Sequence, residues 1–161
     1  MKVAGRISVL MIVFACPSLE AQPRAPELRF HFGTASFWEA RRHVAAGASC
    51  RYYFGKSGWA VEPEYSFMTD NTHQDHMLIM NLVKDLTRPS RNAVLYTLLG
   101  GGMNWHRARV PGLGGLGWGM GVKVWANDRF FISPQFRLGL EPNLRFSVYL
   151  GFAKRRERRH P

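Results

Sequence analysis

The last third of the chain alternates strictly between apolar and polar residues, and this pattern constrains the fold more than any other feature. Over 132–140 every second residue is apolar. After a two-residue step at Pro142 and Asn143, the alternation resumes over 144–152. Side chains of a β-strand point to opposite faces of a sheet, so a period of two predicts a β-hairpin with one apolar and one polar face. What the apolar face touches therefore decides what kind of protein this is.

Six further alternating segments precede this hairpin, and turn residues separate them. We expect one strand per segment, although 76–86 taken alone could also form a short helix. With the hairpin the count is eight strands of about ten residues, the number and length at which an up-and-down sheet closes into a barrel. The six segments cover residues 28–37, 44–54, 59–67, 76–86, 93–106 and 117–125.

Two local details of the strands follow from the same pattern. In the fifth segment we place Val94, Tyr96 and Leu98 on the apolar face. Pro63 and Pro134 fall inside strands. A proline there removes a backbone donor, so we expect a β-bulge at each.

The first 21 residues have the layout of a secretory signal peptide. A basic start and an apolar run over 7–15 precede a small-residue cleavage site at 19–21. The run is too short to span a bilayer as a helix. After removal of the signal, Cys50 is the only thiol, which excludes an internal disulfide. The expected organisation is a signal peptide at 1–21, a short linker at 22–27, a β-barrel at 28–153 and a basic tail at 154–161.

The apolar face is too bulky to fit inside a barrel of this size. The interior of an eight-stranded barrel is just wide enough for side chains to fill. The polar face combines small residues with charges of both signs, whereas one Lys or Arg at the bilayer midplane costs about 2–4 kcal/mol. We therefore predict an all-β protein, an eight-stranded antiparallel up-and-down transmembrane β-barrel. The residues expected to face lipid are Trp59, Val61, Tyr65, Phe67, Val122, Val124, Phe136, Leu138, Phe146, Val148, Leu150 and Phe152.

The polar face carries acidic and basic residues on neighbouring strands. We expect them to form a salt-bridge network inside the barrel, which allows this face to be buried. A proton or ion path is the alternative, although a lumen of this size is normally filled. The expected members of the network are Arg51, Glu62, Glu64, Asp85, Lys123, Arg137 and Arg145.

Four segments carry a resemblance to a known family. They are VEPEYSF at 61–67, the NLV-D run at 81–85, YTLLGGG at 96–102 and the hairpin at 128–152. In these segments the chain resembles the outer-membrane β-barrel domain family, small eight-stranded barrels of the OmpA-like kind. The resemblance implies a Gram-negative outer membrane, insertion by the barrel-assembly machinery and no enzymatic activity common to the family.

Other candidate sites are weaker. The G-x-G-x-x-G match at 112–117 lacks the preceding strand and following helix of a dinucleotide site. The loop containing Asp70, His73, Asp75 and His76 offers ligands that suit zinc or nickel, but such loops are more often simply solvated. We therefore predict no metal and no cofactor.

An acyl hydrolase would need a serine activated by a histidine. The candidates His31, His43, His106 and Ser133 lie on different segments, and none forms a local pair. We therefore predict no catalytic residue. The net charge is +11, and the basic loops at 41–42 and 107–109 and the basic tail would be attracted to phosphates of anionic lipids, including lipopolysaccharide, rather than to nucleic acid.

Three functions remain open. The first is a non-enzymatic integral outer-membrane barrel with a structural or surface-integrity role. The second is a soluble periplasmic lipocalin-like carrier, with the apolar face inward. The third is a lipid-modifying barrel enzyme. With the N-terminus in the periplasm, the loops near Arg41, 70–75, 106–111 and 141–143 would face outward, and all are short.

Overall fold

The computed structural model describes most of the chain after the expected signal peptide. The segments predicted as a signal peptide at 1–21, the start of the linker and most of the basic tail lie outside the described residues. None of the described residues belongs to a helix long and apolar enough to cross a membrane. The described ranges are 25–37, 42–54, 57–70, 74–87, 92–106, 112–140 and 142–154.

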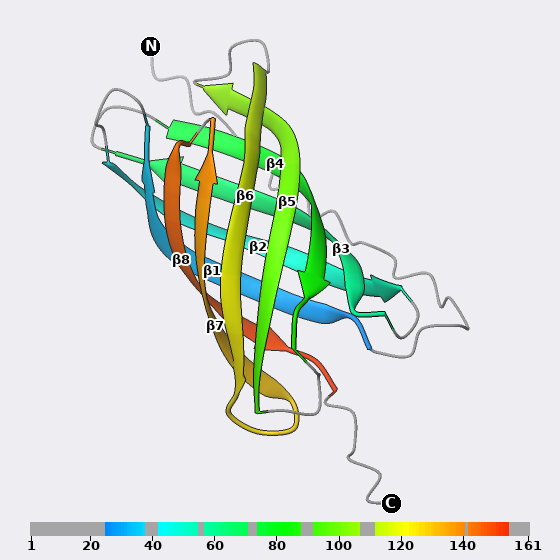
Figure 1. The fold of residues 1–161 in the computed structure, drawn as a ribbon. Coiled ribbons are helices and arrows are strands. Elements are labelled where there is room, and N and C mark those ends of the chain that lie inside the picture. Colours follow the sequence, from blue (N-terminus) through cyan, green and yellow to red (C-terminus); the bar gives the residue numbers. More distant parts are fainter. Residues whose placement is uncertain are drawn as a thin grey trace, which may run out of the picture.

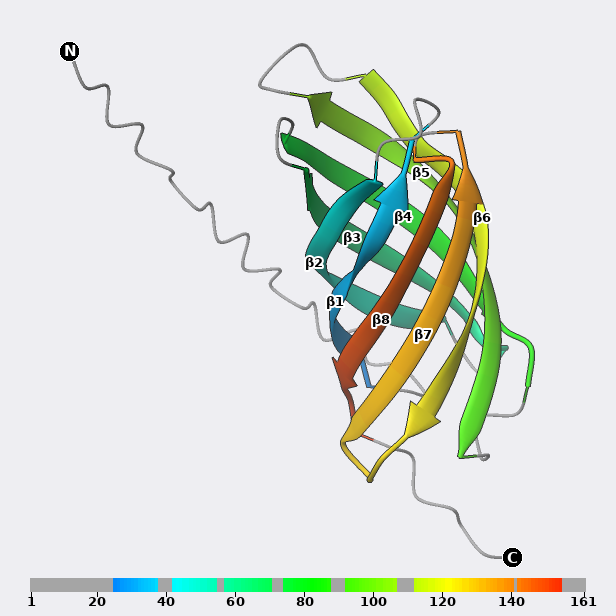
Figure 2. The same cartoon turned by 90° about the vertical axis from the view of Figure 1, so that its left-hand side faces the viewer.

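Eight antiparallel strands form one closed sheet (Figures 1 and 2). Each strand pairs with the next, and β8 pairs with β1. The prediction of an all-β, eight-stranded up-and-down barrel is confirmed, and the ambiguous segment 76–86 lies mostly in β4. The strands are β1 (Glu27–Ser36), β2 (Arg42–Phe54), β3 (Trp59–Thr69), β4 (Gln74–Asp85), β5 (Ala93–His106), β6 (Gly112–Trp125), β7 (Phe130–Gly139) and β8 (Leu144–Phe152).

The first and last strands close the barrel over nearly their whole length. Their register runs without interruption from Leu28 opposite Phe152 to Ser36 opposite Leu144. Closure leaves no long sheet edge exposed, which an open sheet of this composition would present. The connections after β1, β3, β5 and β7 share one end of the barrel, here called the distal end. β1 begins and β8 ends at the other, proximal end.

The bulges expected at the prolines are absent. Residues on both sides of Pro63 keep one register with β2, and the same holds for Pro134 and β6. Each proline therefore removes a ladder hydrogen bond without adding a residue. The one register shift among the described strands lies between β5 and β6, where Gly100–Gly102 opposes Gly114–Gly117. Gly115 has a φ of 67° there, a left-handed conformation typical of bulges that use glycine.

The face assigned to the first half of β5 was wrong. Val94, Tyr96 and Leu98 point into the lumen, where at most 2% of each side chain is exposed. Tyr96 and Leu98 belong, with Tyr53 and Val83, to an apolar cluster near the proximal end. Residues 94–99 are apolar on both parities except for one threonine, so their alternation does not identify the inward face.

The bulge generates a stability prediction. A Cβ on Gly115 would lie 3.0 Å from both the Ile79 and Met77 side chains, and a β-branched residue is strained at its φ. We expect Gly115→Val to lower the free energy of unfolding by at least about 1–2 kcal/mol. Gly112→Val is the matched control, because a Cβ at Gly112 meets nothing within 4 Å. Urea titration of both variants in lipid vesicles measures the difference, and equal stability would contradict the bulge.

Candidate functional site: the outer wall and the charged lumen

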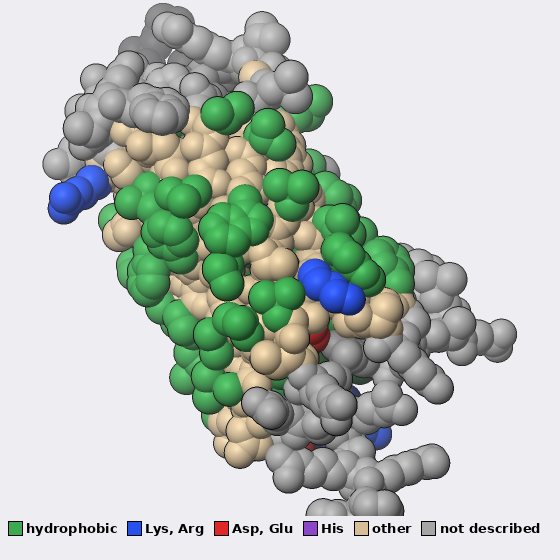
Figure 3. Space-filling view, viewed as in Figure 1, with side chains coloured by type: hydrophobic (Ala, Val, Ile, Leu, Met, Phe, Trp, Pro, Cys, Tyr) green, Lys and Arg blue, Asp and Glu red, His purple; other side chains and the backbone are tan. Residues whose placement is uncertain are grey.

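Large apolar side chains cover the outside of the barrel (Figure 3). Their exposed fractions run from 38% for Val148 to 65% for Phe32. The strands place these residues there because every second side chain points outward. Nine of the twelve residues expected to face lipid are exposed on this outer wall, and Val61, Phe67 and Val122 are half-buried on it. The exposed nine are Trp59, Tyr65, Val124, Phe136, Leu138, Phe146, Val148, Leu150 and Phe152.

Charged side chains fill the inside of the same strands. Glu62 on β3 is fully buried and binds two guanidinium groups. Its Oε2 accepts hydrogen bonds from Arg29 Nη1 at 2.6 Å and from Arg51 Nε at 2.5 Å, and its Oε1 accepts one from Ser49 Oγ at 3.0 Å. One carboxylate therefore joins the inner faces of three consecutive strands, β1, β2 and β3.

A second group of charges lies toward the proximal end. Lys123 on β6 forms an ion pair with Glu27 on β1, and both contact the Tyr53 hydroxyl. Asp85, buried at the end of β4, interacts electrostatically with Lys123. Glu27 was expected in the linker, but it is the first residue of β1 and stands opposite Arg51 in the register.

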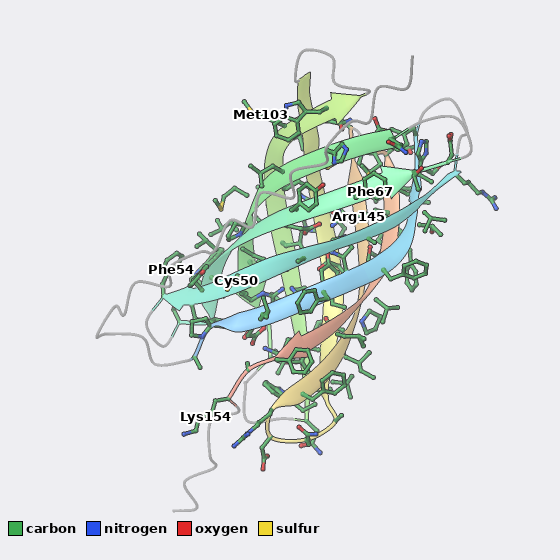
Figure 4. The ribbon with its side chains drawn as sticks, turned by 180° about the vertical axis from the view of Figure 1, so that it is seen from behind. Cys50, Phe54, Phe67, Met103, Arg145 and Lys154 are labelled. Carbon is green, nitrogen blue, oxygen red and sulfur yellow. The ribbon has the colours of Figure 1, made fainter. Side chains whose placement is uncertain are left out.

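A third group surrounds Glu64 (Figure 4, where Arg145 is labelled). Arg145 Nη2 lies 2.5 Å from Glu64 Oε1, and the Tyr149 and Asn81 side chains each donate to Glu64 Oε2 at 3.2 Å. Arg137 faces Arg145 directly across β7 and β8, where two like charges alone would repel. Glu64 interacts with both cations and so offsets the repulsion.

Tyr96 connects the groups, although the sequence pattern placed its side chain on the apolar face rather than inside the lumen. Its hydroxyl lies 3.0 Å from Arg29 Nη2, 2.8 Å from Ser133 Oγ and 3.0 Å from Gln135 Oε1. The Arg51 guanidinium stacks 4.3 Å from its ring centroid. The phenol thus satisfies buried polar groups, and its ring covers a buried cation. A hydroxyl on an otherwise apolar stretch is the signal that could have indicated its inward position.

Apolar layers lie toward both ends of the charged region. Toward the distal end, Ala35, Ala45, Met68, Met77 and Ile79 pack together, each at most 2% exposed. The cluster that contains Tyr53, Val83 and Tyr96 lies toward the proximal end. A water-filled pore would expose these interior side chains, so the lumen is filled rather than open.

The candidate catalytic residues do not assemble into a lipid-accessible site. Ser133 is buried and bonded to Tyr96 and Arg29, and His43 lies near Asp70 and Asp75. His31 does contact a serine, Ser66, at 3.0 Å, but both are buried in the lumen, and the His106 side chain lies outside the described residues.

The candidate cofactor sites do not assemble either. Among the described residues, no three His, Cys, Asp or Glu side chains are grouped so that they could hold a metal ion. His73, from the candidate metal loop, lies outside the described residues. The glycines at 112–117 lie within β6, with no helix after them.

Comparisons with known proteins give fold likenesses only. No family model and no curated protein matches the chain. The crystal structure of Ail, the attachment invasion locus protein of Yersinia pestis, in complex with the heparin analogue sucrose octasulfate, is similar with a TM-score of 0.47 and 12% identity over 81% of this chain and 96% of Ail. The solution NMR structure of the de novo designed TMB2.3 is similar with a TM-score of 0.45 and 11% identity over 84% of this chain and 98% of the design. The closed strand pairing establishes the fold.

The Glu62 cluster generates the second prediction. Glu62→Gln keeps the size of the side chain but removes the charge that neutralises two buried guanidiniums. We expect the free energy of unfolding in lipid vesicles to fall by about 3–5 kcal/mol, the usual cost of breaking a buried ion pair. Asp128→Asn is the matched control, because Asp128 is exposed in a turn and its change should stay within about 0.5 kcal/mol. A similar small effect for both variants would show that the lumen does not depend on this carboxylate.

Proposed function

We propose that the protein is an integral outer-membrane β-barrel, and one observation carries this proposal. The molecule is inverted relative to a water-soluble protein: Arg29, Arg51 and Arg145 are at most 1% exposed, while Phe32, Phe146 and Phe152 are half or more exposed. In water this arrangement would leave a large apolar surface hydrated. In a bilayer the same surface contacts acyl chains, and the closed sheet satisfies the backbone hydrogen bonds.

The height of the apolar wall supports a bilayer. On β4, Leu78, Met80 and Leu82 face outward between His76 and Lys84. The eight residue-to-residue steps from His76 to Lys84 span about 27 Å of strand, or roughly 20 Å in height at the usual tilt, close to the 25 Å band of outer-membrane barrels. Polar and aromatic groups mark both limits. The Tyr65 hydroxyl lies 2.7 Å from His76 Nδ1 toward the distal end, and Lys84 stacks 4.8 Å from the Trp59 ring toward the proximal end.

The contents of the lumen argue against a soluble carrier of an apolar ligand. Such a carrier would turn its apolar face inward around a cavity. Here the inward face carries Glu62, Glu64 and their arginine partners, and apolar layers pack toward both ends.

The same filled lumen supports a non-enzymatic, structural or surface-integrity role rather than a pore. The distal connections support it as well, since only four or five residues separate the strands there. Receptors and adhesins usually display longer loops. The expected partners are outer-membrane lipid, lipopolysaccharide among it, and the barrel-assembly machinery that inserts such barrels.

Membrane fractionation tests the proposal. After expression with its own N-terminus in a Gram-negative host, the protein should stay in the outer-membrane pellet through a sodium carbonate wash. The unheated protein should migrate differently from the boiled protein on a denaturing gel, because a folded barrel resists detergent. Release into the soluble periplasmic fraction would overturn the proposal.

Depth-dependent arginine substitution generates the third prediction. Val148 lies at the middle of β8 and Leu144 at its end, and both face outward. We expect Val148→Arg to lower the free energy of unfolding in vesicles by about 2–4 kcal/mol and Leu144→Arg by only about 0–1 kcal/mol, because an arginine near the interface reaches water. Urea titration measures both. A soluble barrel would show small and similar effects at the two positions.

A further inference from the structure

A buried histidine and two aspartates meet at the distal end of the lumen. His43 lies near the start of β2 and is 4% exposed. Its Nε2 lies 3.4 Å from Asp70 Oδ2, directly after β3, and 3.7 Å from Asp75 Oδ2, near the start of β4. Asp75 is buried as well, and Asp70 is partly buried. One imidazole therefore faces two carboxylates at the ends of two other strands.

The environment of His43 suits a charged ring better than a neutral one. Among the described residues, neither ring nitrogen of His43 has a hydrogen-bond partner. The Phe37 ring packs edge-on against the imidazole, with 4.8 Å between the ring centroids, and β1 places Ala35 opposite His43 in the register. A second ring proton would give the imidazole a positive charge, which two carboxylates at ion-pair distance attract. A neutral ring would leave both carboxylates without that charge.

Neighbouring ionisable groups on β2 and β4 are directed away from the imidazole. Arg42, next to His43 in β2, is exposed on the outer face of that strand. His76, next to Asp75 in β4, faces outward, and its Nδ1 lies 2.7 Å from the Tyr65 hydroxyl. Neither group therefore competes with the two aspartates for the buried ring.

Two more ionisable groups near this level come from β8 and β5. Arg145 on β8 stands opposite Ala35 in the register and forms an ion pair with Glu64. His106 on β5 stands opposite Asp75 in the register, and its side chain lies outside the described residues. His106 therefore needs a variant of its own in any test of pH dependence.

We propose that His43, Asp70 and Asp75 form a proton-controlled latch that ties the distal ends of β2, β3 and β4 together in mildly acidic medium. In unperturbed peptides aspartate ionises near pH 3.9 and imidazole loses its proton near pH 6.5, so a cation and two anions coexist between about pH 4 and 6.5. Above that window the proton leaves, and the two like charges face a neutral ring. The stability that the latch contributes is therefore present at acid pH and lost as the pH rises through the titration of the imidazole. The latch depends on the strand ends and not on the membrane location, so the two proposals fail separately.

Hydrogen–deuterium exchange of the full-length protein tests the latch. In nanodiscs the buffer reaches both ends of the barrel, so the orientation of the protein does not affect the result. Protection of backbone amides, corrected for the intrinsic exchange rate, is compared at about pH 5.5 and about pH 8, on either side of the ordinary imidazole titration. His43→Gln removes the titrating ring, and Asp75→Asn removes one carboxylate. His76→Gln is the matched control, because His76 is a histidine at the same level that faces outward.

In wild type and in His76→Gln, distal amides of β2, β3 and β4 should be about tenfold better protected at the lower pH, as expected for hydrogen bonds to a charged group. In His43→Gln their protection should be the same at both pH values, and in Asp75→Asn the difference should shrink. Amides at the proximal ends of these strands should show no pH difference and serve as the internal control. The distal amides are those of 43–45, 67–69 and 75–77.

A pH difference that persists in His43→Gln, or one that disappears in His106→Gln but not in His43→Gln, would overturn the proposal. The gel shift of a folded barrel checks each variant. If His43→Gln does not fold, Asp70→Asn and Asp75→Asn decide the question, because an undiminished pH difference in both would also overturn the latch.

Discussion

Neutralising charge inside a lumen that excludes water is the constraint on which the rest of this structure depends. Isolated buried ions cost several kcal/mol each, so each must sit beside an opposite charge and further hydrogen-bond partners. Glu62 meets two guanidiniums, Glu64 meets Arg145, and Glu27 meets Lys123. Each of these contacts joins two different strands on the inner face of the barrel. Only with the polar face satisfied in this way can the apolar face of every strand be turned outward.

Space for these long side chains comes from small residues on the same inward face. A Cβ on Gly47 would lie 2.5 Å from the His31 ring, one on Gly121 would lie 2.3 Å from the Tyr96 hydroxyl, and one on Gly151 would overlap the Phe131 ring. Glycine in a strand interior normally weakens it. Here each of these glycines admits an aromatic or imidazole ring, so the local loss is offset by packing across the barrel. Charge pairing and the placement of these glycines therefore both contribute to the packing of the lumen.

The strands and their faces could be read from the sequence wherever one parity is apolar and the other polar. They could not be read over 94–99, where both parities are apolar, or at Glu27, a single charged residue before the first alternation. The sequence also could not show which charged residues pair with one another inside the barrel. Arg29 and Glu62 are 33 positions apart, and their contact depends on strand tilt and register rather than on spacing. The bulge was predicted at the prolines rather than in the glycine run, because the sequence of such a run does not show which glycine adopts a positive φ.

That glycine run shapes both sides of the wall, which links the interior of the barrel to its outer surface. Gly115, in the left-handed conformation, lets Ile79 and Met77 approach inside the lumen and so completes the apolar layer at the distal end. Opposite it, Gly101 falls at the register shift, and its missing side chain leaves an apolar hollow on the outer wall. The register shift that completes the distal layer of the lumen therefore also sets the shape of the outer wall at the same level.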